Sequence, residues 1–414
     1  MKTKPMLARF SLYGFLKNQQ YYDPFLILAF RQMGLSFFSI GVLVAFREIM
    51  VNIIEIPSGA VADLYGRRKS MMLSFAAYIV SFTVFGIVGT VASNGRIDMM
   101  LLMVCLFGSM IFFAIGDAFR TGTHKAMIFT WLRLEGRENE RTRVYGYTRS
   151  WSKLGSALSV ILAAVFVFYT NNFVTIFFFS IIPYVLSLVN FMGYPEELDG
   201  LSDGTTPSIK KTRKPFSEVV THLKDAIGLA FRKCQLRRLV MESMGFEGFF
   251  KAAKDYLQPI LQSAALPVTS MLLLSDQLNE HQQVALLVGP VYFVLYILSA
   301  VASRKAHLLV DRHGSEDKAA RTLWLITVLI LLVVSPAIYL GWFPIVIVGF
   351  MGLYVMQNLW RPVLISRIDS HSKEEAGATI LSIESQAKSA ATMVFAPVLG
   401  FLVDMMRSIG IGAL

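Results

Sequence analysis

Long apolar segments follow one another along most of the chain, and each has about the length of a membrane-spanning helix. A spanning helix needs roughly 20 apolar residues. Eleven such segments can be placed, at approximately 12–32, 37–62, 70–92, 99–120, 151–169, 173–193, 239–262, 283–303, 322–341, 343–365 and 377–402. This pattern predicts an all-α integral membrane protein that crosses the bilayer many times.

The composition and the placement of charge support the bilayer as the partner of the chain. Of its 414 residues, 55% are hydrophobic and 16% are charged, which is more apolar surface than soluble cores could hide. The net charge of +11 does not indicate nucleic acid, because Lys and Arg collect in alternate connections. We therefore expect a multi-pass protein of the inner (plasma) membrane with a cytoplasmic N-terminus and no nucleic-acid partner.

A single long polar stretch divides the chain into two halves. The predicted domains are an N-terminal bundle of six helices at 1–193, a basic cytoplasmic linker at 194–238 and a C-terminal bundle at 239–414. Within the linker, apolar residues of 216–231 recur at helical spacing, which predicts an amphipathic helix on the inner membrane surface.

A short glycine-containing and basic motif lies between the second and third segments. It comprises Gly59, Asp63, Gly66, Arg67 and Arg68. Glycine allows the backbone of a sharp reversal, and the basic residues suit anionic headgroups. The motif thus predicts a tight cytoplasmic turn over 59–69.

A degenerate copy of this motif follows the eighth segment. It consists of Asp311, Arg312 and Gly314, with His307 where the leading glycine would be. Such repetition is typical of transporters built from duplicated bundles.

The motif, its copy and the basic linker resemble the major facilitator superfamily of secondary transporters. The resemblance implies two six-helix bundles related by pseudo-symmetry and alternating access, in which Asp63 holds the start of helix eleven near 375–377. A simple cytoplasmic anchor is the alternative. Two features depart from the family: Leu64 replaces a common basic residue, and only eleven of twelve helices are evident, with 409–414 similar to the first turn of a twelfth.

Ionisable residues inside apolar segments are costly, so each is a functional candidate. Asp23 lies near the middle of the first segment with Gln19 and Gln20, and no basic residue stands three or four positions away. An unpaired carboxylate in a low-dielectric segment readily accepts a proton. Asp23 is therefore predicted to carry a proton or contact substrate, or else to pair with an arginine of another helix.

Two more pairs of charges lie in the second and fourth segments. Arg47 and Glu48 are adjacent and point about 100° apart, so we expect each to find another partner. For Arg47 this is Asp23, an anionic substrate or a structural interhelical pair. Asp117 and Arg120 share a helix face; by resemblance Arg120 matches the fourth-helix arginine that helps handle the proton, and a packing salt bridge is the alternative.

The seventh segment is the most polar. Glu247, Lys251 and Asp255 are spaced by four, which predicts a charged stripe lining a cavity or the interface between halves, or a structural ladder of ion pairs. Glu384 and Lys388 repeat the spacing in segment eleven and are expected to satisfy each other.

By resemblance, the first, fourth, seventh and tenth helices line the cavity. Gln357, Asn358, Trp360 and Arg361 supply donors and an aromatic face in the tenth. The proton-coupling candidates are Asp23, Asp117, Arg120 and Glu247. The cavity candidates are Gln19, Gln20, Arg47, Glu48, Lys251, Asp255, Gln357, Asn358 and Arg361.

The remaining motifs restrict the function. The sequence has no G-x-x-x-x-G-K-[ST] phosphate loop and no zinc-protease motif, so we expect neither ATP-driven pumping nor an enzyme, a cofactor or a metal. The leading prediction is a monomer that exports a small organic solute by proton antiport. Uptake by symport is the second candidate, and a transport-inactive scaffold or sensor on the same fold is the third.

Overall fold

The computed structural model describes residues 3–120, 123–137, 141–199, 234–272, 276–371 and 377–408, and these form helices and turns without strands. The predicted all-α class is confirmed. Seven helices in the described part are long and apolar enough to cross a membrane. The predicted amphipathic helix at 216–231 lies outside the described residues.

The chain divides into two compact units, each with its own core. Unit 1 comprises Met1–Leu201 and Leu261–Tyr296, and unit 2 comprises Ser202–Ile260 and Ile297–Leu414. The predicted domain boundaries stay predictions.

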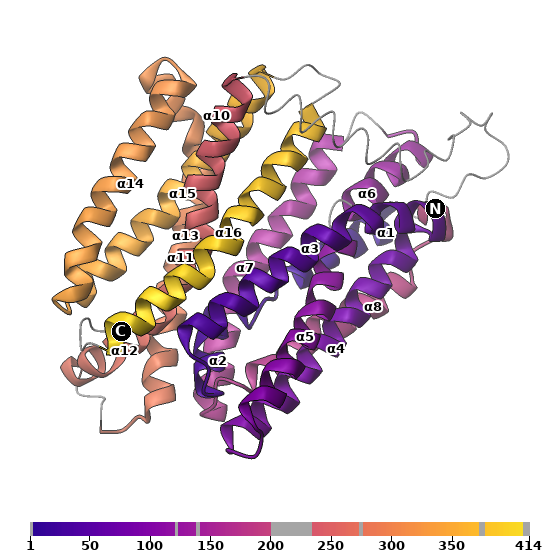
Figure 1. Cartoon of the computed structure of the whole chain (residues 1–414). Coiled ribbons are helices and arrows are strands. Elements are labelled where there is room, and N and C mark those ends of the chain that lie inside the picture. Colours follow the sequence, from indigo (N-terminus) through magenta and orange to yellow (C-terminus); the bar gives the residue numbers. More distant parts are fainter. Residues whose placement is uncertain are drawn as a thin grey trace. The chain divides into compact units, whose positions relative to one another are not determined.

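Unit 1 contains most of the N-terminal helices, and α4 packs against both α5 and α8 while α1 packs against α7 (Figure 1). Its elements are α1 (Thr3–Lys17), η1 (Asp23–Phe25), α2 (Leu26–Gln32), α3 (Phe37–Tyr65), α4 (Arg67–Ser93), α5 (Met99–Arg120), α6 (Thr123–Leu134), α7 (Arg141–Thr170), α8 (Ile176–Met192), η3 (Glu196–Asp199), most of α12 (Leu257–Met271) and the first half of α13 (Glu280–His313).

The first predicted segment, 12–32, is not one continuous helix. α1 ends at Lys17, and the chain resumes as the short 3-10 helix η1 before α2 begins at Leu26. Pro24 is at the start of η1, where its missing N–H costs no helical hydrogen bond. Asp23 therefore lies at a helix break and not inside a regular spanning helix.

Serine side chains join α4 to α5 within unit 1. Ser81 and Ser109 donate to each other's backbone carbonyls at 3.0 and 2.8 Å, and the Ser74 hydroxyl donates to the Gly116 carbonyl at 2.6 Å. A Cβ on Gly116 would lie 2.7 Å from the ring of Tyr78. Small residues thus let these helices approach closely, as in other membrane helix pairs.

The turn between α3 and α4 is far shorter than the predicted 59–69 turn. α3 continues to Tyr65 and α4 begins at Arg67, so Gly66 alone reverses the chain, with a φ of 97°. That conformation favours glycine. The predicted turn residues Gly59 and Asp63 accordingly belong to the last turns of α3.

The faded copy forms a similar reversal in unit 2. α13 continues to His313, Gly314 has a φ of 68°, and Ser315 caps α14 by accepting from the backbone N–H of Lys318. Asp311 and Arg312 are therefore helical, and both are exposed.

Unit 2 has a broken helix at its start. The predicted segment 239–262 is divided into α10 (Cys234–Ser243), a π-helical turn η4 (Met244–Gly248), α11 (Phe249–Ala253), a 3-10 turn η5 (Lys254–Tyr256) and α12 (Leu257–Met271). Three long helices and the end of α13 (Glu280–His313) complete unit 2, namely α14 (Glu316–Tyr339), α15 (Phe343–His371) and α16 (Gly377–Ser408).

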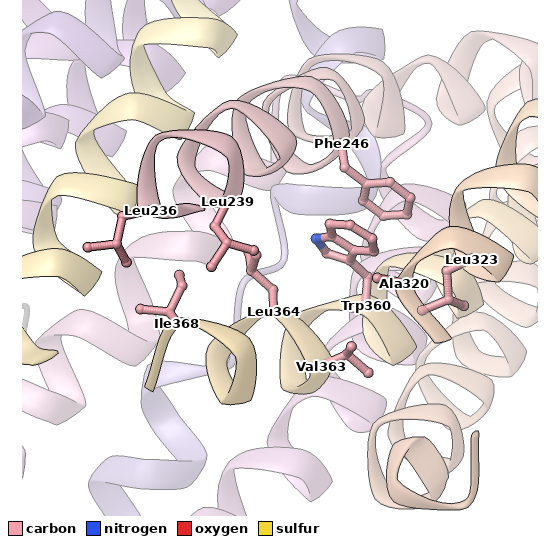
Figure 2. Close-up of a cluster of buried hydrophobic side chains, with 9 residues drawn as sticks. All are labelled: Leu236, Leu239, Phe246, Ala320, Leu323, Trp360, Val363, Leu364 and Ile368. Carbon is pink, nitrogen blue, oxygen red and sulfur yellow. The ribbon is translucent and has the colours of Figure 1, made fainter. Parts of the chain in front are cut away.

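A hydrophobic cluster holds α10, α14 and α15 together (Figure 2). Phe246 and Trp360 stack with ring centroids 4.5 Å apart, and Leu236, Leu239, Ala320, Leu323, Val363, Leu364 and Ile368 fill the space around them. Trp360, predicted as an aromatic face of a cavity, is fully buried in this core.

Candidate functional site

Unit 1 contains a partly buried ion pair at the end of α5. Nη2 of Arg120 lies 3.1 Å from Oδ1 of Asp117, as the shared helix face predicted. The Tyr78 hydroxyl donates to the same oxygen, and the Arg120 guanidinium lies 5.4 Å from the centroid of the Tyr78 ring. Tyr184 stacks on Tyr78 with centroids 4.3 Å apart. Aromatic groups therefore enclose a salt bridge inside a spanning helix.

The prediction that Arg47 and Glu48 look elsewhere is wrong. Nη2 of Arg47 lies 2.9 Å from Oε1 of Glu48, and the Glu48 side chain is only 3% exposed. The side chains of adjacent helical residues leave the helix about 100° apart. The arginine side chain is long enough to bend across that angle and reach Glu48. The Arg47 guanidinium also lies 5.5 Å from the centroid of the Phe113 ring.

Asp23 has a partner that the sequence did not indicate. The Tyr296 hydroxyl donates to Oδ2 of Asp23 at 2.9 Å, and both residues belong to unit 1. Gln19 is buried and donates to the Gly155 carbonyl at 3.0 Å, which joins α7 to the end of α1. Gln20 is half-buried. No residue spacing relates Asp23 to Tyr296, because they lie 273 positions apart.

The basic residues of the motif contact protein groups. Arg67 donates to the Thr130 hydroxyl and Arg68 to the Tyr194 carbonyl, both at 2.9 Å. These bonds attach the start of α4 to α6 and to the segment after α8. The predicted contact of Asp63 with 375–377 lies outside the described residues.

In unit 2, two buried glutamates share one arginine. Nη1 of Arg361 lies 2.9 Å from Oε2 of Glu247 and 2.8 Å from Oε1 of Glu384. Lys388 lies 3.3 Å from the same oxygen of Glu247, and the Ser243 hydroxyl donates to Glu384. The carboxylates come from η4 and α16, and the guanidinium comes from α15.

The expected pair of Glu384 with Lys388 is wrong in the described part of the chain, because Glu384 binds Arg361 and Lys388 binds Glu247. Glu247, from the predicted charged stripe, also binds across to Arg361. The π turn that contains Glu247 changes the angle between successive side chains, so the four-residue spacing to Lys251 no longer aligns the two. Asp255 lies 3.0 Å from Lys254.

The polar residues beside Arg361 on α15 have modest contacts. Asn358 donates to the Tyr354 carbonyl at 2.9 Å within its own helix, and Gln357 is half-buried.

A second ion cluster in unit 2 was missed. Arg367, 5% exposed, lies 2.6 Å from Glu242 and 2.8 Å from Asp317. No spacing in the sequence indicates this cluster, since Glu242 and Asp317 are distant from Arg367 in the chain.

The comparisons with known proteins agree on one fold. The family model described as Major Facilitator Superfamily matches residues 10–396. A mutant of the nucleoside transporter NupG has 10% identity and a TM-score of 0.75, with 98% of this chain and 94% of that chain covered. No curated protein sequence matches the chain.

Two further solved structures have the same fold. A bacterial homologue of the iron transporter ferroportin, in an inward-facing state, has 11% identity, a TM-score of 0.66 and coverage of 97% and 92%. A D-xylose-proton symporter has 13% identity, a TM-score of 0.62 and coverage of 95% and 88%. At these identities the likeness concerns the fold alone.

Proposed function

Because the chain belongs to the Major Facilitator Superfamily, we propose that it moves a small organic solute across the plasma membrane by alternating access, with proton movement as the driving force. The observation that carries this proposal is the Asp117–Arg120 pair. It lies at the end of α5, a helix of 22 residues with an 18-residue stretch of mean hydropathy 2.4, where charges are costly unless they serve a function.

The proton-coupling residues of the proposal are Asp23, Asp117, Arg120 and Glu247. Asp23 and Asp117 each accept from a tyrosine hydroxyl, so each carboxylate has a neutral donor that can remain when a proton arrives. The similar fold of a D-xylose-proton symporter supports proton coupling as the energy source. The motif residues around Gly66 are proposed to act in gating.

The direction of transport follows from how proton and solute share the site. Efflux by antiport requires that the two compete, whereas uptake by symport requires that they bind together. The sequence favoured efflux by antiport. The partly exposed Arg361 beside two buried carboxylates instead favours uptake by symport, because a solute on the arginine and a proton on a carboxylate can be bound together.

Reconstitution in proteoliposomes tests the proposal. We expect wild-type protein to exchange at least one compound of a metabolite panel and to accumulate it under a proton gradient. Asp117→Asn should abolish the gradient-driven accumulation. Asp98→Asn should leave this accumulation intact. Asp98 is exposed at the other end of the same helix, where its carboxylate accepts from the backbone N–H of Met100.

Absence of any exchange by folded wild-type protein would instead support the scaffold or sensor. Accumulation by Asp117→Asn equal to that of wild type would remove Asp117 from the coupling mechanism.

A further inference from the structure

Glu384 is the most enclosed charged side chain of the cluster in unit 2, with an exposed fraction of 0%. The sequence assigned it a structural role beside Lys388. Its Oε1 instead binds Nη1 of Arg361 at 2.8 Å and accepts from the Ser243 hydroxyl. Arg361 is therefore the one cation within ion-pairing distance of Glu384 among the described residues.

Each glutamate has a second, buried oxygen, Oε1 of Glu247 and Oε2 of Glu384. Neither has a hydrogen-bond partner among the described residues. A buried acceptor left unpaired costs about 1–3 kcal/mol, and more when it is charged. Arg361 and Lys388 thus supply the positive charge beside the two carboxylates, which have acceptor capacity to spare.

Arg361 is the accessible member of the cluster. Its side chain is 30% exposed, whereas those of Glu247 and Glu384 are 4% and 0% exposed. Among the described residues, only Nη1 of Arg361 has hydrogen-bond partners. The N–H groups of Nη2 and Nε can therefore donate to a ligand. A guanidinium with such donors suits the two oxygens of a carboxylate or phosphate.

The backbone around the carboxylates is packed closely. A Cβ on Gly248 would lie 2.6 Å from the Cβ of Ala391, and the Thr392 hydroxyl donates to the Gly248 carbonyl at 3.2 Å. The π turn that contains Glu247 is therefore fixed against α16, which contains Glu384. Isolated π turns occur frequently at functional sites. Arg361 comes from a third helix, α15, and is not part of this close contact.

We propose that Arg361 binds the anionic group of the solute, and that Glu384, assisted by Glu247, takes up one proton from water when the anion draws the guanidinium away. The solute is then a small organic anion, a carboxylate or a phosphate ester. Without Arg361, Glu384 keeps, of its partners in the described part of the chain, the neutral Ser243 hydroxyl, and a carboxylate without a cation in a low-dielectric interior accepts a proton instead.

In this arrangement, binding of the anion raises the affinity for the proton, and binding of the proton raises the affinity for the anion by the same factor. The two therefore travel together, which is symport. This inference rests on the transport function proposed above, and it specifies the solute class and the direction of coupling.

The first test needs no solute. Infrared difference spectra of purified protein should show a new protonated-carboxyl band in Arg361→Gln that wild type lacks at neutral pH. The band should disappear in Arg361→Gln/Glu384→Gln and persist in Arg361→Gln/Asp404→Asn, where a carboxyl elsewhere on α16 is removed. A band that is absent from Arg361→Gln, or that survives Glu384→Gln, overturns the proton assignment even if the protein transports.

The second test measures the linkage with stated probes. Calorimetric titration with benzoate, inorganic phosphate and neutral benzamide, in buffers of different ionisation enthalpy, reports the protons taken up. We expect benzoate or phosphate to bind with uptake of a proton and benzamide not to bind. Arg361→Gln should weaken anion binding roughly tenfold or more.

Glu384→Gln separates the two halves of the proposal, because it should bind the anion without proton uptake. Anion binding without proton uptake in wild type, or unchanged in Arg361→Gln, refutes the linkage. Gradient-driven transport of neutral compounds alone would leave the proposed function standing while it refutes the anionic solute class.

Discussion

Asp117→Asn removes one charge from the ion pair in α5 while it keeps the shape of the side chain. The asparagine carbonyl can still accept from the Tyr78 hydroxyl, so that hydrogen bond survives. The negative charge that faces Nη2 of Arg120 at 3.1 Å is lost. Nη1 of Arg120 is already buried without a hydrogen-bond partner among the described residues. The substitution therefore leaves a guanidinium cation enclosed without an anion in this pair.

The size of the effect follows from burial. Removing one partner of a fully buried pair costs about 3–5 kcal/mol, and a hydrogen bond to a charged group contributes about 1.5–3 kcal/mol. The Asp117 side chain is 30% exposed and that of Arg120 is 14% exposed, so water reduces the upper figure. We expect Asp117→Asn to lower the free energy of unfolding by about 2 kcal/mol.

A double-mutant cycle provides the control for this estimate. Unfolding in mixed detergent micelles, titrated with SDS and followed by tryptophan fluorescence, gives the free energy for each variant. Asp117→Asn/Arg120→Gln should lose less stability than the sum of the single variants, because it removes the orphaned cation. A loss below about 0.5 kcal/mol in Asp117→Asn, or strict additivity in the cycle, would refute the reasoning.

Two further predictions concern unit 1. Desolvation, with a smaller contribution from Lys17, lowers the pKa of the His124 imidazole from 6.5 to about 3. Over that range the unfolded chain binds a proton that the folded chain does not, so stability falls as the pH falls, by up to about 1.4 kcal/mol per pH unit. His124→Phe should remove most of this slope in unfolding titrations at several pH values, and an unchanged slope contradicts the assignment. Gly116→Val should destabilise the protein by about 1–3 kcal/mol through its clash with Tyr78, whereas Gly108→Val on the same helix, with open space at its Cβ, should not; equal losses in the two variants contradict the close approach.

The spanning helices were predictable because an apolar segment in a bilayer has few ways to satisfy its backbone. The predicted 99–120 segment coincides with α5, Met99–Arg120. The break in the seventh segment was not predictable. Met244–Gly248 forms a π turn, and neither its glycines nor Glu247 distinguishes such a turn from a regular helix in the sequence.

Ion-pair partners were the least predictable part of the candidate site. Spacing along a helix suggests that Glu384 pairs with Lys388. In the structure Glu384 pairs with Arg361, and Lys388 pairs with Glu247. Asp117 and Arg120 were predicted as neighbours and are neighbours, since three-residue spacing on a regular helix leaves little choice. Pairing across helices depends on tertiary contacts that a single sequence does not display.

The single-residue connection at Gly66 limits how two long helices can move. α3 is helical up to Tyr65 and α4 from Arg67, so one residue of about 3.8 Å joins them. A tether this short forbids sliding of one helix along the other. Relative motion of the two helices at this end is therefore rotation about the φ and ψ bonds of Gly66, which makes this glycine the hinge between α3 and α4.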